Sequence, residues 1–98
     1  MATLLMADGR EFPITKPLTL AGMQSYVGGY IEVVTIGGTP DAREILIVDE
    51  DGHGRGKSLN VEATRLYRGH PPRHDGVIVG DAIRCICTHM GTEDEAYA

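Results

Sequence analysis

The sequence has 98 residues, and its 14 acidic and 9 basic side chains give a formal net charge of −5. A chain of this length forms one domain with one modest core. The negative charge argues against direct binding to nucleic acid or to an anionic membrane, since both require a basic surface. No run approaches the roughly 18 apolar residues of a membrane span, and the N-terminus lacks the basic start and apolar core of a secretory signal. These features predict a soluble cytoplasmic protein.

The chain begins with a predicted hairpin. Short apolar runs at Thr3–Met6 and Glu11–Ile14 flank Asp8-Gly9, a dipeptide that favours a tight turn between strands. Proline cannot donate a hydrogen bond to a neighbouring strand, so Pro13 places the second run at a sheet edge.

A short helix is predicted next. Leu20, Met23 and Val27 recur at helical spacing, Thr19 is the expected N-cap, and Gly28-Gly29 ends the helix because glycine accepts the left-handed conformation.

Two strands are predicted at Tyr30–Ile36 and Ile45–Val48, paired antiparallel and joined by a loop at Gly37–Asp41. The second strand is apolar at consecutive positions, which indicates a central place in the sheet.

A second helix is predicted after Asn60, which is a good N-cap, and Gly69 ends it. The segment His70–Gly76 contains two prolines and a glycine and is expected to be irregular. Val77–Val79 and Ala82–Thr88 are expected to form the last strand, with a bend at Gly80-Asp81.

The predicted order is β-β-α-β-β-α-β. It indicates an α+β fold: a mainly antiparallel sheet with both helices packed on one face. Residues 1–90 form the predicted domain, and residues 91–98 form an acidic tail that we expect to be disordered.

Three stretches are more specific than their secondary structure requires. They are Val27–Val34, Leu46–Gly52 with Leu59-Asn60 and Ala63-Thr64 behind it, and Ile78–Ala82. In this order and spacing they resemble the family called domain of unknown function 3846, over roughly residues 4 to 87. The family consists of small proteins of phages, plasmids and bacterial or archaeal genomes. The resemblance therefore implies a role in phage or plasmid biology, and it brings no established activity.

The turn before the second helix departs from the family pattern, because it is more basic and richer in glycine. Its Gly-Lys-Ser ending is similar to a phosphate-binding loop, but Asp51 stands where that loop needs a glycine. Two interpretations stay open. The turn is either a surface loop without a ligand or an anion site at the helix N-terminus. The residues that would form the anion site are Gly54, Arg55, Gly56, Lys57 and Asn60.

Four residues have side chains that suit zinc, namely His70, His74, Cys85 and Cys87. The two cysteines lie one residue apart on a predicted strand, so we expect them to be buried, reduced and free of metal. No metal or other cofactor is predicted. Asp49 and Asp51 begin like a calcium loop, but Asn60 stands where the twelfth-position acid should be.

No catalytic residue is predicted. Ser25, Ser58, Cys85, His53 and His74 supply reactive side-chain types, but their spacing assembles no nucleophile with a base. Glu32 and Arg84 are charges within apolar strands, and they could pair if their strands are neighbours.

The leading hypothesis is a non-enzymatic accessory protein of a phage or mobile element that binds a host protein. The alternatives are a binder of a small anionic metabolite, such as a nucleotide, and a small enzyme of a class that the sequence does not reveal. We also expect the domain to form a homodimer, because a short chain with an open sheet face has strand edges to cover.

Overall fold

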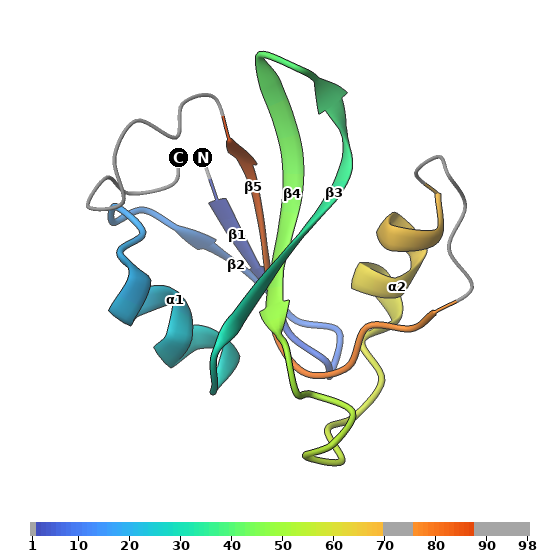
Figure 1. The fold of residues 1–98 in the computed structure, drawn as a ribbon. Coiled ribbons are helices and arrows are strands. Elements are labelled where there is room, and N and C mark those ends of the chain that lie inside the picture. Colours follow the sequence, from blue (N-terminus) through green and yellow to red (C-terminus); the bar gives the residue numbers. More distant parts are fainter. Residues whose placement is uncertain (1, 70–75, 88–98) are drawn as a thin grey trace.

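The computed structural model describes residues 2–69 and 76–87. The elements are β1 (Ala2–Leu5), β2 (Glu11–Ile14), α1 (Leu20–Val27), β3 (Ile31–Thr39), β4 (Ala42–Asp49), α2 (Val61–Arg68) and β5 (Ala82–Cys87) (Figure 1). The predicted α+β fold and the predicted order of elements are both confirmed. None of the described helices is long and apolar enough to cross a membrane.

The five strands form one antiparallel sheet in the order β2-β1-β5-β4-β3. The predicted β1-β2 hairpin turns at Asp8-Gly9, where Gly9 has a φ of 96°. Strand β2 is an edge strand, as Pro13 indicated. Strand β4 is internal, and its residues Ile45–Val48 are buried.

The hairpin between β3 and β4 is longer than predicted. Gly37–Thr39 continue β3 instead of forming the expected loop, so that Thr39 pairs with Ala42 and only Pro40 and Asp41 turn the chain. The register shifts between Thr35 and Gly37, which is a β-bulge. Gly38 has a φ of 85°, and a Cβ there would meet the backbone of Ala42. Glycine therefore allows the strand to continue past the bulge.

Both predicted N-caps are present. The hydroxyl of Thr19 accepts a hydrogen bond from the N–H of Gly22, and the side chain of Asn60 accepts one from the N–H of Ala63. Gly28 ends α1 in the left-handed conformation, as expected.

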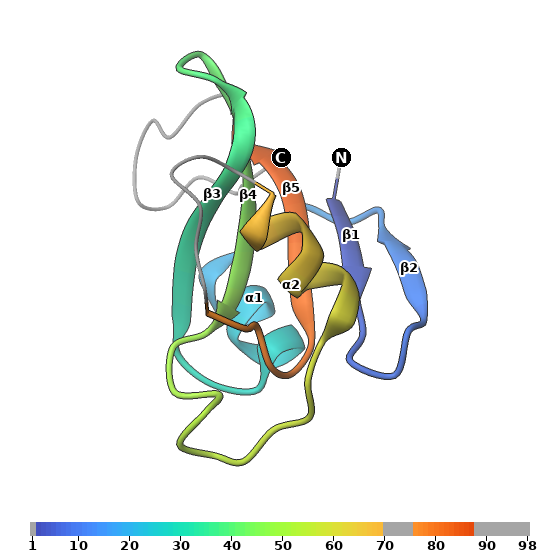
Figure 2. The ribbon, with the colours of Figure 1, turned by 90° about the vertical axis from the view of Figure 1, so that its right-hand side faces the viewer.

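The two helices lie on opposite faces of the sheet, so the prediction that both pack on one face is wrong (Figures 1 and 2). Met23 and Val27 of α1 pack with Ile45, Ile47 and other residues on one face. Ala63 of α2 packs with Leu46 and Val48, among others, on the opposite face. The physical reason is the two-sided apolar character of β4, since each of its faces needs a cover.

The last strand is shorter than predicted. Ala82–Cys87 form β5, whereas Val79 makes an isolated bridge with Leu59. Gly80 has a φ of 79° and separates the two, in agreement with the predicted bend. The predictions for Thr88, for His70–Asp75 and for the tail at residues 91–98 lie outside the described residues.

Candidate functional site

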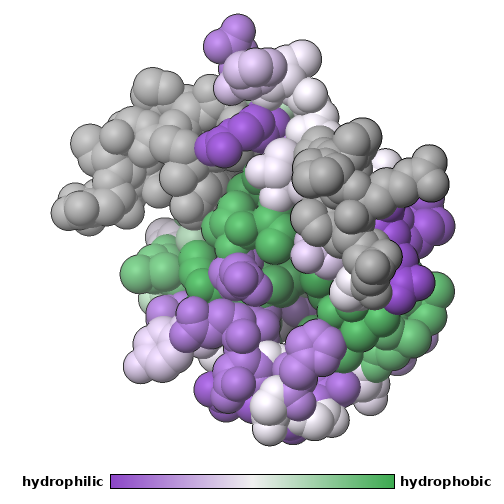
Figure 3. Space-filling view, turned by 45° about the vertical axis from the view of Figure 1, so that its right-hand side comes forward, coloured by the Kyte–Doolittle hydropathy of each residue, from purple (hydrophilic) through white to green (hydrophobic). Residues whose placement is uncertain are grey.

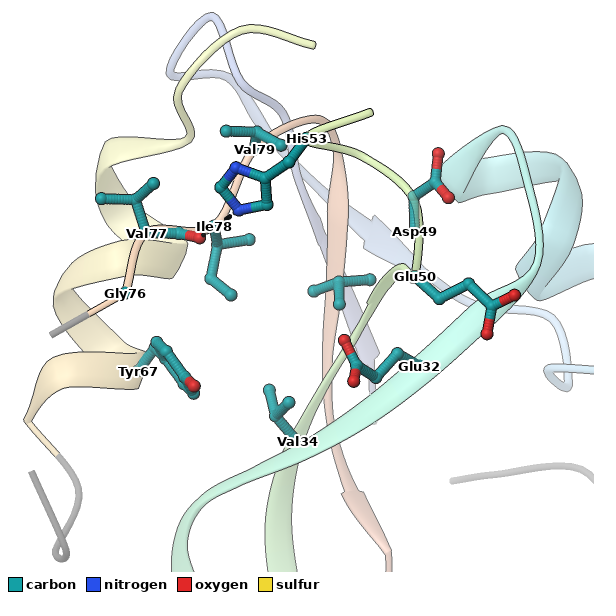
Figure 4. Close-up of a pocket in the computed structure, with 11 residues that line it drawn as sticks. Glu32, Val34, Asp49, Glu50, His53, Tyr67, Gly76, Val77, Ile78 and Val79 are labelled. Carbon is teal, nitrogen blue, oxygen red and sulfur yellow. Dashed lines mark hydrogen bonds between the residues drawn. The ribbon is translucent and has the colours of Figure 1, made fainter. Parts of the chain in front are cut away.

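A hollow of about 430 Å³ lies on the face of the sheet that α2 covers. Val34 of β3, Val48 of β4 and Ile78 give it an apolar floor. Figure 3 shows an apolar area in the middle of this side of the molecule, bordered by hydrophilic residues. In Figure 4, Tyr67 of α2 stands on one side of the hollow, and Glu32 and Val34 of β3 stand on the other.

The rim of the hollow is acidic. Glu32 and Glu50 are exposed residues that line it, and His53 lies above it. In Figure 4 the carboxylate of Glu32 points toward the hollow, whereas that of Glu50 points away from its centre. The His53 Nε2 atom lies 3.0 Å from the carbonyl oxygen of Val77, so Nε2–H donates to that oxygen. No Lys or Arg occurs among the described residues that line the hollow. The rim therefore favours a cationic group over an anion.

The lining offers groups that can hold a ligand. Its described residues include a histidine, a tyrosine and acidic side chains, which can bind through hydrogen bonds and charge. An apolar floor under a few polar groups is typical of a binding pocket, and 430 Å³ falls within the usual range of about 300–1,000 Å³.

The basic turn lies on the other side of the end of β4 and is held by internal contacts. The Lys57 ammonium lies 2.7 Å from the Asp49 carboxylate and donates to the carbonyl oxygen of Val27, at the end of α1, at 2.5 Å. The side chain of Asp49 is only 1% exposed. A Cβ on Gly80 would lie 2.7 Å from Cδ of Lys57, so this glycine makes room for the lysine stem.

Arg55 adds a second cation to Asp49, with its Nε 3.3 Å from the carboxylate. Burial alone would raise the pKa of Asp49. The hydrogen bond from Lys57, the hydrogen bond from the N–H of Asp51 and the charges of Lys57 and Arg55 outweigh burial and lower the pKa below its ordinary value. The carboxylate thus partly neutralises the two cations of the proposed anion site.

Asn60 is buried, and its side chain is used structurally. Its Nδ2 donates to the carbonyl oxygens of Leu5 and Gly80, each at 2.9 Å, and its Oδ1 accepts from Ala63 at 3.0 Å. Both amide hydrogens are therefore used within the fold.

The structure brings Arg55 and Lys57 together around Asp49, while Gly54 and Gly56 are exposed positions of the same turn. Gly56 has a φ of 67° with open space around its Cα. Asn60 is buried, and its side chain bonds to Leu5, Gly80 and Ala63 and not to this cluster. Whether the turn binds an anion stays a prediction.

The remaining candidates are placed as follows. Cys85 is 1% exposed and belongs to the core cluster, as predicted, whereas the side chain of Cys87, His70 and His74 lie outside the described residues. Within the described part of the chain, no three His, Cys, Asp or Glu residues come together as metal ligands. Arg84 binds Glu44 at 2.8 Å, and β4 separates it from Glu32, so these two are not neighbours.

A family model for a domain of unknown function, DUF3846, matches residues 1–96 of the sequence. This chain belongs to the DUF3846 family. No curated protein and no solved structure matches it. The DUF3846 match supports the resemblance predicted from the three stretches, and it assigns no activity to the hollow.

The hollow itself was not predicted from the sequence. Glu32 was singled out as a charge in an apolar strand, which was the one useful signal. Glu50, His53 and Tyr67 reach the same hollow only because β3, β4 and α2 meet there. The segment Gly76–Val79 completes it, and the sequence assigned most of that segment to a strand.

Proposed function

We propose that this protein is a non-enzymatic binding module that holds a basic side chain of a protein partner in the hollow. The main support is that the acidic residues Glu32 and Glu50 border an apolar floor. The floor consists of Val34, Val48 and Ile78. A lysine or arginine has an apolar stem and a charged head, so its two parts match the floor and the rim. In the phage or plasmid setting that the family resemblance implies, the partner would be a host protein in the cytoplasm.

The charge of the whole chain supports a basic partner. A net charge of −5 attracts a positively charged surface from a distance and raises the rate of encounter. The attraction at the exposed rim should weaken with salt, because exposed charges are screened beyond about 8–10 Å at physiological ionic strength.

The test is a chemical-shift titration of the isotopically labelled full chain with N-acetyl-lysine N-methylamide. We expect affinity on the order of millimolar, with shifts at Val34, Val48 and Ile78. The norleucine analogue, which keeps the stem and lacks the charge, should bind more weakly, and the glutamate analogue should not shift these residues.

The matched variants keep the fold and change only charge. Replacing both rim acids, Glu32→Gln with Glu50→Gln, should remove the shifts. Replacing two exposed acids elsewhere, Glu11→Gln with Asp41→Asn, should leave them. Shifts that are equal for the lysine and glutamate analogues, or that survive the rim variant, would contradict the proposal.

The anionic-ligand function is the second candidate, and one observation favours it. Arg55 and the 68% exposed Tyr30 line a smaller hollow of about 230 Å³ together with Gly29 and Gln24. A nucleotide could stack its base on Tyr30 and place its phosphate at Arg55. Titration with nucleotides should then shift residues 52 to 60, and Arg55→Ala with Lys57→Ala should remove those shifts.

A further inference from the structure

We propose that the partner enters as an added strand: an extended segment pairs with the outer edge of β3 and places a Lys or Arg into the acidic hollow. This inference rests on the proposed function, since it uses the same hollow. Beyond that function, it specifies that the bound segment of the partner is extended, and it specifies the order of the side chains along that segment.

The first observation is that β3 has a usable edge. It is the last strand in the sheet order, and no strand of the described chain pairs with its outer side. Its segment Ile31–Thr35 pairs with β4 in regular register up to the bulge. It contains no proline and no lysine, the residues that commonly prevent strand addition.

The opposite edge is protected. Strand β2 has four residues and carries Pro13, which has no N–H to offer. The exposed Arg10 and Lys16 flank it. Among the described residues, a partner strand therefore finds regular backbone groups without a strand partner at β3, whereas β2 is interrupted by Pro13.

The second observation is that β3 itself supplies residues of the hollow. Glu32 and Val34 are two positions apart and lie on the same face as Val48 and Leu46, their partners on β4. An added strand would lie about 4.8 Å from β3, with alternate side chains on that face. Its side chains would therefore lie directly beside Glu32 and Val34.

These positions specify the partner sequence. The residue opposite Glu32 should be basic and the residue opposite Val34 apolar, because directly opposite side chains contact each other. In an antiparallel segment, the residue opposite Val34 comes before the residue opposite Glu32, so the partner sequence is apolar, any residue, basic. A parallel segment reads basic, any residue, apolar.

Charge complementarity selects this occupant over a second copy of the chain. A second β3 paired across the edge would bring another Glu32 close to a rim that already holds Glu32 and Glu50. Like charges beside each other in a sheet are destabilising, whereas a basic residue forms a cross-strand pair.

The experiment uses the labelled full chain and an eight-residue peptide. Every second residue of the peptide is threonine, and the residues between are valine and lysine, with valine before lysine as expected for an antiparallel segment. We expect shifts at Ile31–Thr35 and Glu50, and slower hydrogen exchange at alternate amides of β3. A peptide N-methylated at the strand-pairing amides should bind roughly tenfold more weakly, because it loses inter-strand hydrogen bonds. N-methylation at the intervening amides is the control and should have little effect.

The protein variants are matched in the same way. Glu32→Gln should weaken binding about threefold, as expected for one cross-strand charge pair. Glu11→Gln should not change binding, because Glu11 lies on the same face of the sheet at the opposite edge.

Three results would overturn the inference. Equal affinity for both N-methylated peptides would overturn strand addition and leave the basic-side-chain function standing. No shift at the hollow with any basic peptide or lysine analogue would overturn both. A dimer in sedimentation that protects the β3 amides without peptide would assign the edge to a second copy.

Discussion

Asp49 offers the sharpest test of the structure, since it is an almost fully buried carboxylate between two cations. Asp49→Asn removes the charge that meets Lys57 at 2.7 Å and Arg55 at 3.3 Å, and it keeps an oxygen that can accept from the N–H of Asp51. Removing one partner of a fully buried pair costs about 3–5 kcal/mol. Lys57 and Arg55 are 24% and 46% exposed, so water can partly replace the carboxylate. We therefore expect a loss of about 2 kcal/mol, or roughly 8–16 °C in Tm for a domain of this size.

The lowered pKa of Asp49 determines how its contribution to stability changes with pH. The folded-state pKa of Asp49 lies below the unfolded value of 3.8. A lowered pKa contributes stability that is fully present above the unfolded value and is lost as pH falls through the folded value. The difference in unfolding free energy between the natural chain and Asp49→Asn should therefore be constant from about pH 7 to pH 5 and shrink below about pH 4.

Urea unfolding at a series of pH values measures both quantities. The control is Glu50→Gln, which removes the same charge from the neighbouring exposed position and should change stability by less than about 0.5 kcal/mol. Equal stability of Asp49→Asn and the natural chain at pH 7 would refute the reasoning. A gap that stays constant down to pH 3 would refute the link to the charge of Asp49.

Three further predictions concern the fold. Asn60→Ala should destabilise the chain by about 3 kcal/mol, because it removes a helix cap and two buried hydrogen bonds from the Asn60 amide to the carbonyl oxygens of Leu5 and Gly80. Urea unfolding measures this, and a loss below about 1 kcal/mol would show that only the cap matters. Gly38→Ala should lower Tm more than Gly56→Ala, because both glycines have positive φ but only Gly38 has backbone in the way of a Cβ; equal losses would contradict the role of steric space. In a Cys87→Ser background, the Cys85 thiol should react with a disulfide reagent only upon unfolding, since it is 1% exposed, and rapid labelling of the folded chain would show otherwise.

The parts of the fold that depend on neighbouring residues could be predicted from the sequence. Thr19 and Asn60 cap their helices through backbone groups three residues away, and Asp8-Gly9 turns a hairpin whose strands it joins. Pro13 identified its strand as an edge strand, because a residue without an N–H cannot complete the hydrogen bonds to a strand on each side. In each case the cause lies within a few residues of the effect.

The parts that depend on strand order could not be predicted in the same way. Arg84 and Glu32 were candidate partners, yet β4 lies between their strands and Arg84 binds Glu44 instead. The placement of the helices was wrong although the consecutive apolar residues Ile45–Val48 required cover on both faces. Asn60 was recognised as a cap, but its two bonds to Leu5 and Gly80 join segments that are distant in the sequence.

The two candidate sites share one structural origin, the end of β4. Val48 faces the hollow, while the next residue, Asp49, faces Lys57 on the other side of the sheet, because successive side chains of a strand alternate. The turn that follows carries Glu50 and His53 to the rim, and the same turn is held down by Arg55 and Lys57 through Asp49. The cations that first suggested an anion site thus have a second role, which is to fix the loop that gives the hollow its acidic rim. A buried pair of this kind adds little net stability compared with apolar packing. Its effect is to hold Glu50 and His53 in position, as the proposed binding of a basic side chain requires.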